Sequence, residues 1–187
     1  MRSPFSFIVK PIGGSRYVNK KEIEGVDFIV SSSEENHKAS NRMAEVLETP
    51  IGYEGSVRKG DILLVHHNVF KFYNDMYGKK KSGKSFFKDD LFFVDSDQFY
   101  MYKRGEQWFA YDKYCFIKPI KKISKSIDTN DKEEPLMGEM IYPNMYMKKK
   151  GVEKGNIVAY QPDCNYEFVV EGERMYRLYD HQITIVL

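Results

Sequence analysis

The sequence predicts an all-β protein built from two tandem copies of one small β module, a barrel or a sandwich. Three observations support this: short apolar stretches with period-2 alternation, turn residues between them at short intervals, and motifs that occur twice. Aromatic residues make up 15% of the chain, and large rings suit pleated sheet faces, where they pack across strands. No segment longer than ten residues shows the apolar stripe of a helix.

Nine stretches are expected to be strands because they alternate or are rich in β-branched and aromatic residues. They cover residues 5–10, 61–65, 98–102, 107–111, 114–118, 156–160, 166–170, 174–179 and 182–187. Turn residues separate them, for example Lys-Gly-Asp at 59–61 and Lys-Gly-Asn at 154–156. Many short strands with frequent turns are typical of a small barrel or a sandwich.

Several motifs return in the second half of the chain. Residues 8–12 (Ile-Val-Lys-Pro-Ile) return as 116–120 (Phe-Ile-Lys-Pro-Ile). The pairs 43–46 with 137–140, 57–63 with 152–158, and 104–112 with 171–180 also match. Such a repeat predicts two units of one fold, which we place at residues 1–114 and 115–187.

One segment of the first unit has the pattern of a partner-binding loop. Phe28, Ile29 and Val30 follow Gly25 and precede a polar run, Ser-Ser-Ser-Glu-Glu-Asn, at 31–36. That run favours solvent, and apolar residues beside it indicate a groove on a partner protein. The alternative is a short strand packed on the protein's own core.

Taken in order, these motifs resemble the GroES-type co-chaperonins, the lids of the chaperonin folding chamber. The Lys-Pro strand, the Gly-preceded apolar triplet, Arg-Met-Ala-Glu-Val at 42–46 and Val-Arg-Lys-Gly-Asp-Ile at 57–62 carry the resemblance. It covers nearly the whole chain as two tandem GroES-like barrels. It implies a co-chaperonin that caps a GroEL-type chaperonin through a mobile loop, with Gly25, Phe28, Ile29 and Val30 as the contacts. It also implies a homo-oligomeric ring of seven chains around an unfolded client protein, with no cofactor.

The two copies differ in ways that affect this interpretation. The second copy's loop, residues 121–135, is shorter and charged, with Ile123 and Ile127 as isolated aliphatic residues. We therefore expect only the first unit to contact a chaperonin. The first copy also carries an insertion at about residues 70–97, to which the sequence assigns no role.

Composition excludes several other classes of protein. The net charge of +2 favours neither nucleic acid nor an anionic membrane, and the lysine runs at 79–81 and 148–150 are expected to be solvated loops. No apolar run reaches membrane-span length, and the start of the chain lacks the apolar core of a signal peptide. Cys115 and Cys164 form neither a disulfide framework nor a thiolate metal site. These features predict a cytoplasmic protein.

No catalytic motif is visible, so the sequence predicts a binding protein and not an enzyme. His66 and His67 are adjacent, and adjacent strand residues face opposite ways, which excludes joint binding of one metal ion. Ser-Gly-Lys-Ser at 82–85 resembles the end of a P-loop but lacks its correctly spaced leading glycine, and a P-loop also needs a strand before it and a helix after it. The rival interpretation is a structural assembly protein, such as a viral head or tail component, since the Lys-, Asn- and Tyr-rich composition suits an AT-rich genome.

Overall fold

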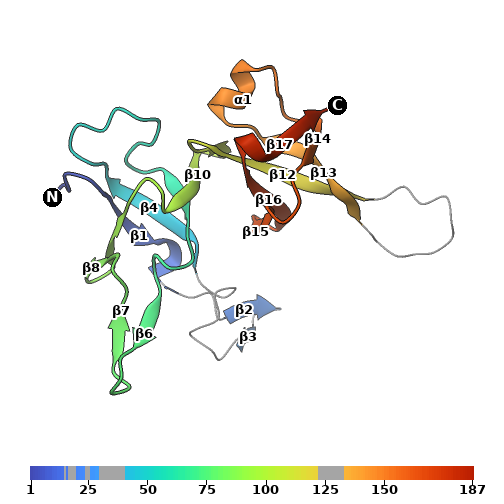
Figure 1. Ribbon diagram of the computed structural model, residues 1–187. Coiled ribbons are helices and arrows are strands. Elements are labelled where there is room, and N and C mark those ends of the chain that lie inside the picture. The colour runs from blue at the N-terminus through green and yellow to red at the C-terminus, as the bar shows by residue number, and fades with distance from the viewer. Residues whose placement is uncertain (15, 17–19, 24–25, 30–40, 122–132) are drawn as a thin grey trace. The chain divides into compact units, whose positions relative to one another are not determined.

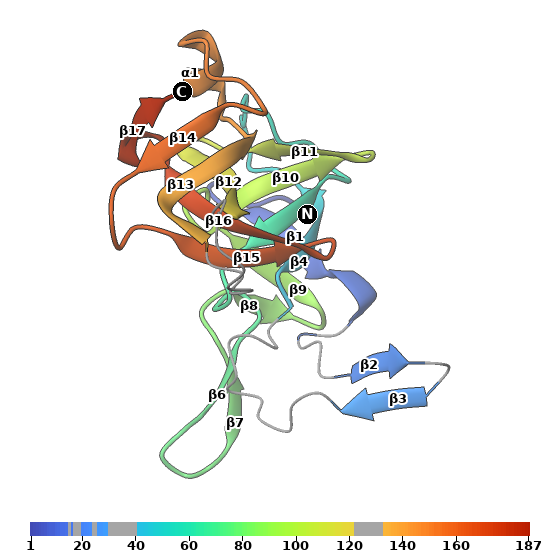
Figure 2. The ribbon, with the colours of Figure 1, turned by 90° about the vertical axis from the view of Figure 1, so that its right-hand side faces the viewer.

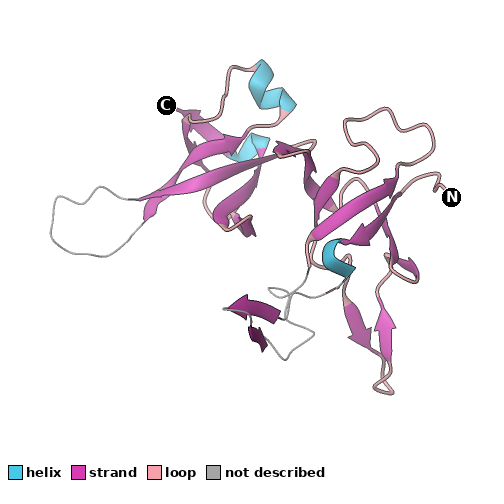
Figure 3. Ribbon diagram, turned by 180° about the vertical axis from the view of Figure 1, so that it is seen from behind, coloured by secondary structure: helices cyan, strands magenta, loops and turns pink. Residues whose placement is uncertain are grey.

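The computed structural model describes all residues except 15, 17–19, 24–25, 30–40 and 122–132 (Figure 1). The described chain has an all-β fold, as predicted, with antiparallel sheets joined by loops and only short helical turns (Figure 3). It divides into two compact units, Met1–Gln107 and Trp108–Leu187. Each of the nine predicted strands is confirmed, with small differences at the ends.

The first sheet has seven strands in the order β11-β10-β5-β4-β1-β9-β8. In that order they span Gln107–Ala110, Phe99–Arg104, Ile62–Val65, Met43–Glu48, Phe7–Pro11, Leu91–Val94 and Phe86–Lys88. A 3-10 turn, η1 (Ile12–Gly14), follows β1. Two separate hairpins complete the described part of this unit: β2 (Lys20–Ile23) with β3 (Val26–Ile29), and β6 (Phe72–Asn74) with β7 (Lys80–Ser82).

The second sheet has six strands in the order β15-β16-β12-β13-β14-β17 (Figure 2). In that order they span Tyr166–Val170, Glu173–Tyr179, Tyr114–Lys121, Glu133–Tyr142, Ile157–Tyr160 and Ile183–Val186. Helix α1 (Met145–Lys149) lies between β13 and β14, and the 3-10 turn η2 (Asp180–Gln182) precedes β17. Asn144 is the N-cap of α1. Its side-chain oxygen accepts a hydrogen bond from the backbone N–H of Met147 at 2.8 Å, which stabilises the start of the helix.

The two sheets repeat one topology. The order β10-β5-β4-β1-β9-β8 in the first corresponds to β17-β14-β13-β12-β16-β15 in the second. The register agrees as well: Lys10 pairs with Glu45 in the first unit, and Lys118 pairs with Glu139 in the second. Both strand pairs carry an irregularity one step earlier, at Ile8/Val9 and at Phe116/Ile117. The motifs at 8–12 and 43–46 therefore occupy the same places as their second copies.

The turn before the third strand of each repeat is also the same. Gly60 donates to the carbonyl of Val46 at 2.8 Å, and Gly155 donates to that of Met140 at 2.8 Å. Both glycines have positive φ, +86° and +94°, a region that other residues adopt only with strain. The matched motifs at 57–63 and 152–158 thus form one type of turn.

One predicted match is wrong. Residues 171–180 correspond to β9, because Phe92 pairs with Val9 as Tyr176 pairs with Ile117. The predicted counterpart, 104–112, lies at the β10–β11 hairpin. Both segments have a glycine with positive φ, Gly105 and Gly172, and this signal is common to tight hairpins in general. It follows that β8 and β9 belong to the repeat, and the insertion reduces to the part around β6–β7.

Buried side chains fill equivalent positions in the two units. The fully or nearly buried pairs are Val9 with Ile117, Val46 with Met140, Leu63 with Val158, Val65 with Tyr160, Phe92 with Tyr176, and Val94 with Leu178. The same strands therefore bury matching positions in the two units, which explains why their apolar residues recur at the same places. Neither sheet closes into a barrel within the described residues, so the predicted closure is not seen there.

The contact between β12 and β13 gives a first testable prediction, because a large residue, Ile117, packs there against a glycine, Gly138. A Cβ atom on Gly138 would lie 2.7 Å from Cδ1 of Ile117 and 2.9 Å from the carbonyl oxygen of Lys118. The first unit has buried Ala44 in place of Gly138 and Val9, which lacks a δ-methyl group, in place of Ile117. We expect Gly138→Ala to lower the free energy of unfolding by about 1–3 kcal/mol because the strands must separate.

Chemical denaturation measures this effect. Adding Ile117→Val to Gly138→Ala removes the clashing methyl group, so the double variant should recover part of the loss relative to the sum of the single changes. Additive losses would contradict the packing explanation.

Candidate functional site

The segment between β1 and β4 carries the residues predicted to contact a partner. Within it, β2 and β3 pair antiparallel, with Lys21 opposite Phe28 and Lys20 opposite Ile29. Gly25 and Val30 lie outside the described residues. In the described part of the chain, β2 and β3 form a sheet of their own that joins no other sheet. Phe28 and Ile29 are thus in a strand, but not in a strand of the seven-stranded sheet.

Phe28 and Ile29, the two described residues of the predicted triplet, lie on opposite faces of this hairpin. Successive strand residues lie on opposite faces, so Phe28 shares a face with Val26, and Ile29 shares a face with Asp27. Ile23 pairs with Val26 and joins the face that holds Phe28. One face therefore has three apolar positions, at Ile23, Val26 and Phe28. The sequence analysis missed Ile23 and Val26, although their alternation with Phe28 was a usable signal.

The two ends of the segment are joined at its base. The backbone N–H of Asn41 donates to the carbonyl of Arg16 at 3.0 Å. The side chain of Asn41 donates to the carbonyl of Ile12 at 2.8 Å and accepts from the N–H of Met43 at 2.9 Å. Asn41 is only 5% exposed, so buried hydrogen bonds hold the start and end of the segment together.

The corresponding segment of the second unit is also joined at its base. Lys121 pairs with Glu133 across β12 and β13. Ile123 and Ile127 lie outside the described residues. The expectation that this segment makes no chaperonin contact therefore remains a prediction.

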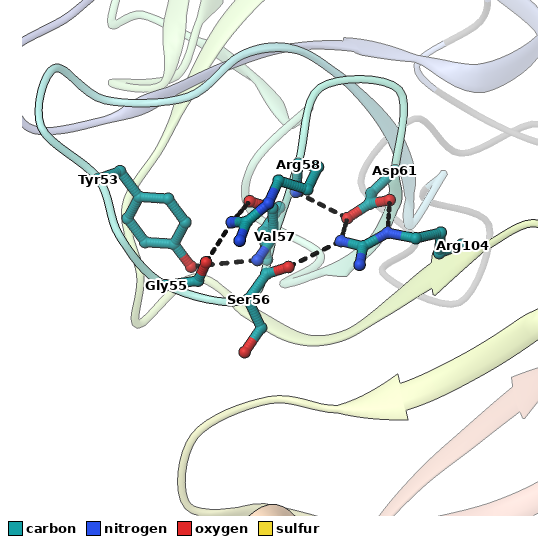
Figure 4. Close-up of polar contacts among 7 residues, drawn as sticks. All are labelled: Tyr53, Gly55, Ser56, Val57, Arg58, Asp61 and Arg104. Carbon is teal, nitrogen blue, oxygen red and sulfur yellow. Dashed lines mark hydrogen bonds and ion pairs between the residues drawn. The ribbon is translucent and has the colours of Figure 1, made fainter.

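A buried carboxylate organises the turn before β5 (Figure 4). Asp61 is 3% exposed, and its two oxygens accept hydrogen bonds of 2.9 and 2.7 Å from Nε and Nη2 of Arg104. The second oxygen also accepts from the N–H of Arg58 at 2.7 Å. The hydrogen bond to Asp61 raises the pKa of Arg104, and Nη2 of Arg104 also donates to the carbonyl of Ser56 at 2.7 Å. The donors Arg58 and Arg104 and the acceptors Asp61 and Ser56 all belong to turns or strands of the first unit. The cluster therefore stabilises the fold of this unit.

His66 and His67 do not face opposite ways as predicted. Their ring centroids are 4.1 Å apart, because the chain leaves β5 at Val65 and turns, with the N–H of Val69 donating to the carbonyl of His66 at 3.0 Å. The alternation rule applies only within a strand. Within the described residues, no group of three or more His, Cys, Asp or Glu side chains is placed to hold a metal ion.

The segment at 82–85 is followed by a strand, β8, where a P-loop requires a helix. Within it, the N–H of Gly83 donates to the carbonyl of Lys71 at 3.0 Å. The local geometry is that of a strand connection and not of a phosphate cradle.

The two cysteines are free thiols of different exposure, and they give a second prediction. Burial raises the pKa of Cys115 to about 12, and burial also raises that of the part-exposed Cys164. Since the thiolate is the reactive form, we expect iodoacetamide at pH 8 to modify Cys164 first and Cys115 only after unfolding. Mass spectrometry of peptides from native and urea-treated protein measures this order. Equal modification of both thiols in native protein would contradict it.

Within the described ranges, no helix has the length and hydropathy that crossing a membrane requires. Comparison of the chain with models of known protein families and with curated proteins found no match.

Proposed function

We propose that this protein is a co-chaperonin, made of two tandem GroES-like modules, that caps a GroEL-type chaperonin ring and encloses an unfolded client protein. The main support is the place of the β2–β3 hairpin. It is inserted between β1 and β4 of a unit in which β1 carries the Lys-Pro motif and β5 follows the Gly-Asp motif, and both of these strands pair with β4. The two motifs come in this order along the chain in the GroES-like pattern. In this proposal, the residues around Phe28 and Ile29 make the chaperonin contact.

The energetics of one hairpin favour a weak and reversible contact. Burying each large apolar side chain yields about 1.5–3 kcal/mol, whereas fixing each residue of the segment costs about 1–2 kcal/mol. A two-stranded hairpin is marginal in water by itself, although its pairing in β2 and β3 lowers the cost that docking must meet. The balance for one copy is close to zero.

A ring of chains turns these weak contacts into tight capping. Several hairpins facing a ring-shaped partner bind at high effective concentration, so affinity rises without new contacts. Seven chains would present seven first-unit hairpins to the seven subunits of a chaperonin ring, and the second units would enlarge the cap. Head-to-tail contacts between identical chains close into a ring when the rotation allows it.

Two measurements test this proposal. Co-sedimentation with a GroEL-type chaperonin should occur with ATP or ADP present and not without nucleotide. Native mass spectrometry should show a species of seven times 22.0 kDa. A structural assembly protein would not sediment with the chaperonin under either condition. A persistent monomer at micromolar concentration would contradict the ring.

A further inference from the structure

The insertion of the first unit is attached to the residue at the start of the β2–β3 segment. The guanidinium carbon of Arg16 lies 4.2 Å from the ring centroid of Phe72, 4.6 Å from that of Phe86 and 4.7 Å from that of Phe92. Its Nη1 atom donates a hydrogen bond of 2.8 Å to Oγ of Ser82. These partners come from β6, β8, β9 and β7, so one side chain connects both hairpin strands of the insertion to the main sheet.

The rings around Arg16 are themselves held by packing. Phe92 is fully buried, and Phe70 and Phe86 meet it edge to face, with centroids 4.8 and 5.6 Å away. Arginine suits this position because its planar guanidinium stacks on ring faces and still donates hydrogen bonds at its edge, which a lysine ammonium does not do.

We propose that Arg16 is a positioning residue, and that the aromatic cage of Phe72, Phe86 and Phe92 fixes the base from which the β2–β3 hairpin extends. The carbonyl of Arg16 accepts a hydrogen bond from the N–H of Asn41. The cage therefore holds Arg16, at the start of the segment, directly, and it holds Asn41, at the end of the segment, through this hydrogen bond. A hairpin on a fixed base loses less orientational freedom when it docks. This consequence rests on the proposed function, whereas the clamp itself does not.

The second unit fixes its own inserted segment at the equivalent place with different chemistry. Tyr176, the counterpart of Phe92, donates from its hydroxyl to Oε2 of Glu133 at 2.8 Å and accepts from Nη2 of Arg174 at 2.8 Å. Glu133 is the first residue of β13, directly after 122–132. Both units thus attach one end of this segment to the same position of the sheet, Phe92 in the first unit and Tyr176 in the second. The first unit uses a guanidinium stacked on aromatic rings, and the second uses a carboxylate that is hydrogen-bonded to a tyrosine.

Amide hydrogen exchange tests the clamp without any partner. Arg16→Gln removes the cation, and we expect the amide of Asn41 to exchange about tenfold faster, as the loss of a desolvated cation–π contact implies. The amide of Val46, bonded to the carbonyl of Asp61 at 2.9 Å, serves as the reference in the sheet. If Arg16→Gln acts only on the clamp, the amide of Val46 should keep its exchange rate. A general loss of stability would instead accelerate both amides.

Matched variants separate the cage from charge and surface effects. Phe72→Leu should reproduce the faster exchange, while Tyr73→Leu, on the next and half-exposed residue, should not. Arg16→Lys should resemble Arg16→Gln if stacking matters more than charge, and Lys84→Gln should have no effect. Unchanged exchange at Asn41 in Arg16→Gln, or equal acceleration at Val46, would overturn the clamp.

Chaperonin affinity then tests the positioning role. Arg16→Gln should bind the chaperonin about tenfold more weakly while its rings assemble normally. Faster exchange with unchanged affinity would show that the clamp does not position the hairpin. If the unmodified protein fails to bind chaperonin, the proposed function fails, and the exchange experiment alone decides whether the clamp exists.

Discussion

Replacing Ile29 with Asp should abolish chaperonin binding and leave ring assembly intact. A carboxylate driven into an apolar groove costs several kcal/mol, and the loss recurs at every chain of a ring that binds through all its hairpins. Nucleotide-dependent co-sedimentation measures binding, and native mass spectrometry of the same sample measures assembly.

The matched control is Asp27→Asn, a change of charge on the same hairpin face as Ile29 that should retain binding. Phe28→Asp tests the opposite face, which also holds Ile23 and Val26 by register. Unchanged affinity of the Ile29 variant would show that the contact is assigned wrongly. Loss of binding with Phe28→Asp alone would move the contact to the face of Ile23, Val26 and Phe28.

The second large effect is expected at the buried carboxylate. Asp61→Ala should lower the free energy of unfolding by about 3 kcal/mol, because it leaves Arg104 and the N–H of Arg58 without their shared acceptor. Asp61→Asn should cost less, about 1–2 kcal/mol, since an amide oxygen can still accept from Arg58. Urea denaturation followed by circular dichroism gives both values.

The second unit provides the control for this prediction. Asn156 occupies the place of Asp61, and its Oδ1 accepts from the N–H of Glu153 at 2.7 Å. The same turn therefore forms with a neutral acceptor. Asn156→Ala should lose only the turn bond, about 1 kcal/mol. Equal losses for Asn156→Ala and Asp61→Ala would show that Arg104 contributes little.

Much of the fold was predictable from local pattern, and the failures have physical causes. Strands such as β10 and β15 alternate or are rich in aromatic and β-branched residues, and the sequence reveals them. Strand β9 is a four-residue apolar run, Leu-Phe-Phe-Val, like β5, but it lies within residues 70–97, which the repeat comparison set aside as an insertion, and it was not assigned for that reason. The repeat was found where whole turns recur, at 57–63 and 152–158, and was misplaced where only a hairpin glycine matched.

The candidate site was predictable only in part. The position of Phe28 and Ile29 in the chain was clear, but which residues of β2 share a face with each of them depends on the register with β2. Arg16 had no local signal at all, because its three rings come from strands far along the chain. A contact of this kind becomes visible only when the sheet brings β9 beside β1.

The two repeats differ in residue size at one place, with Ile117 and Gly138 in the second and Val9 and Ala44 in the first, and this difference has a consequence for how the chain folds. Tandem copies of one topology can mispair during folding, with a strand of one copy entering the sheet of the other. If β4 took the place of β13 beside β12, the methyl group of Ala44 would meet Cδ1 of Ile117 and the carbonyl of Lys118, which leave room only for Gly138. This swapped pairing is therefore penalised by the clash, which favours the pairing of β12 with β13.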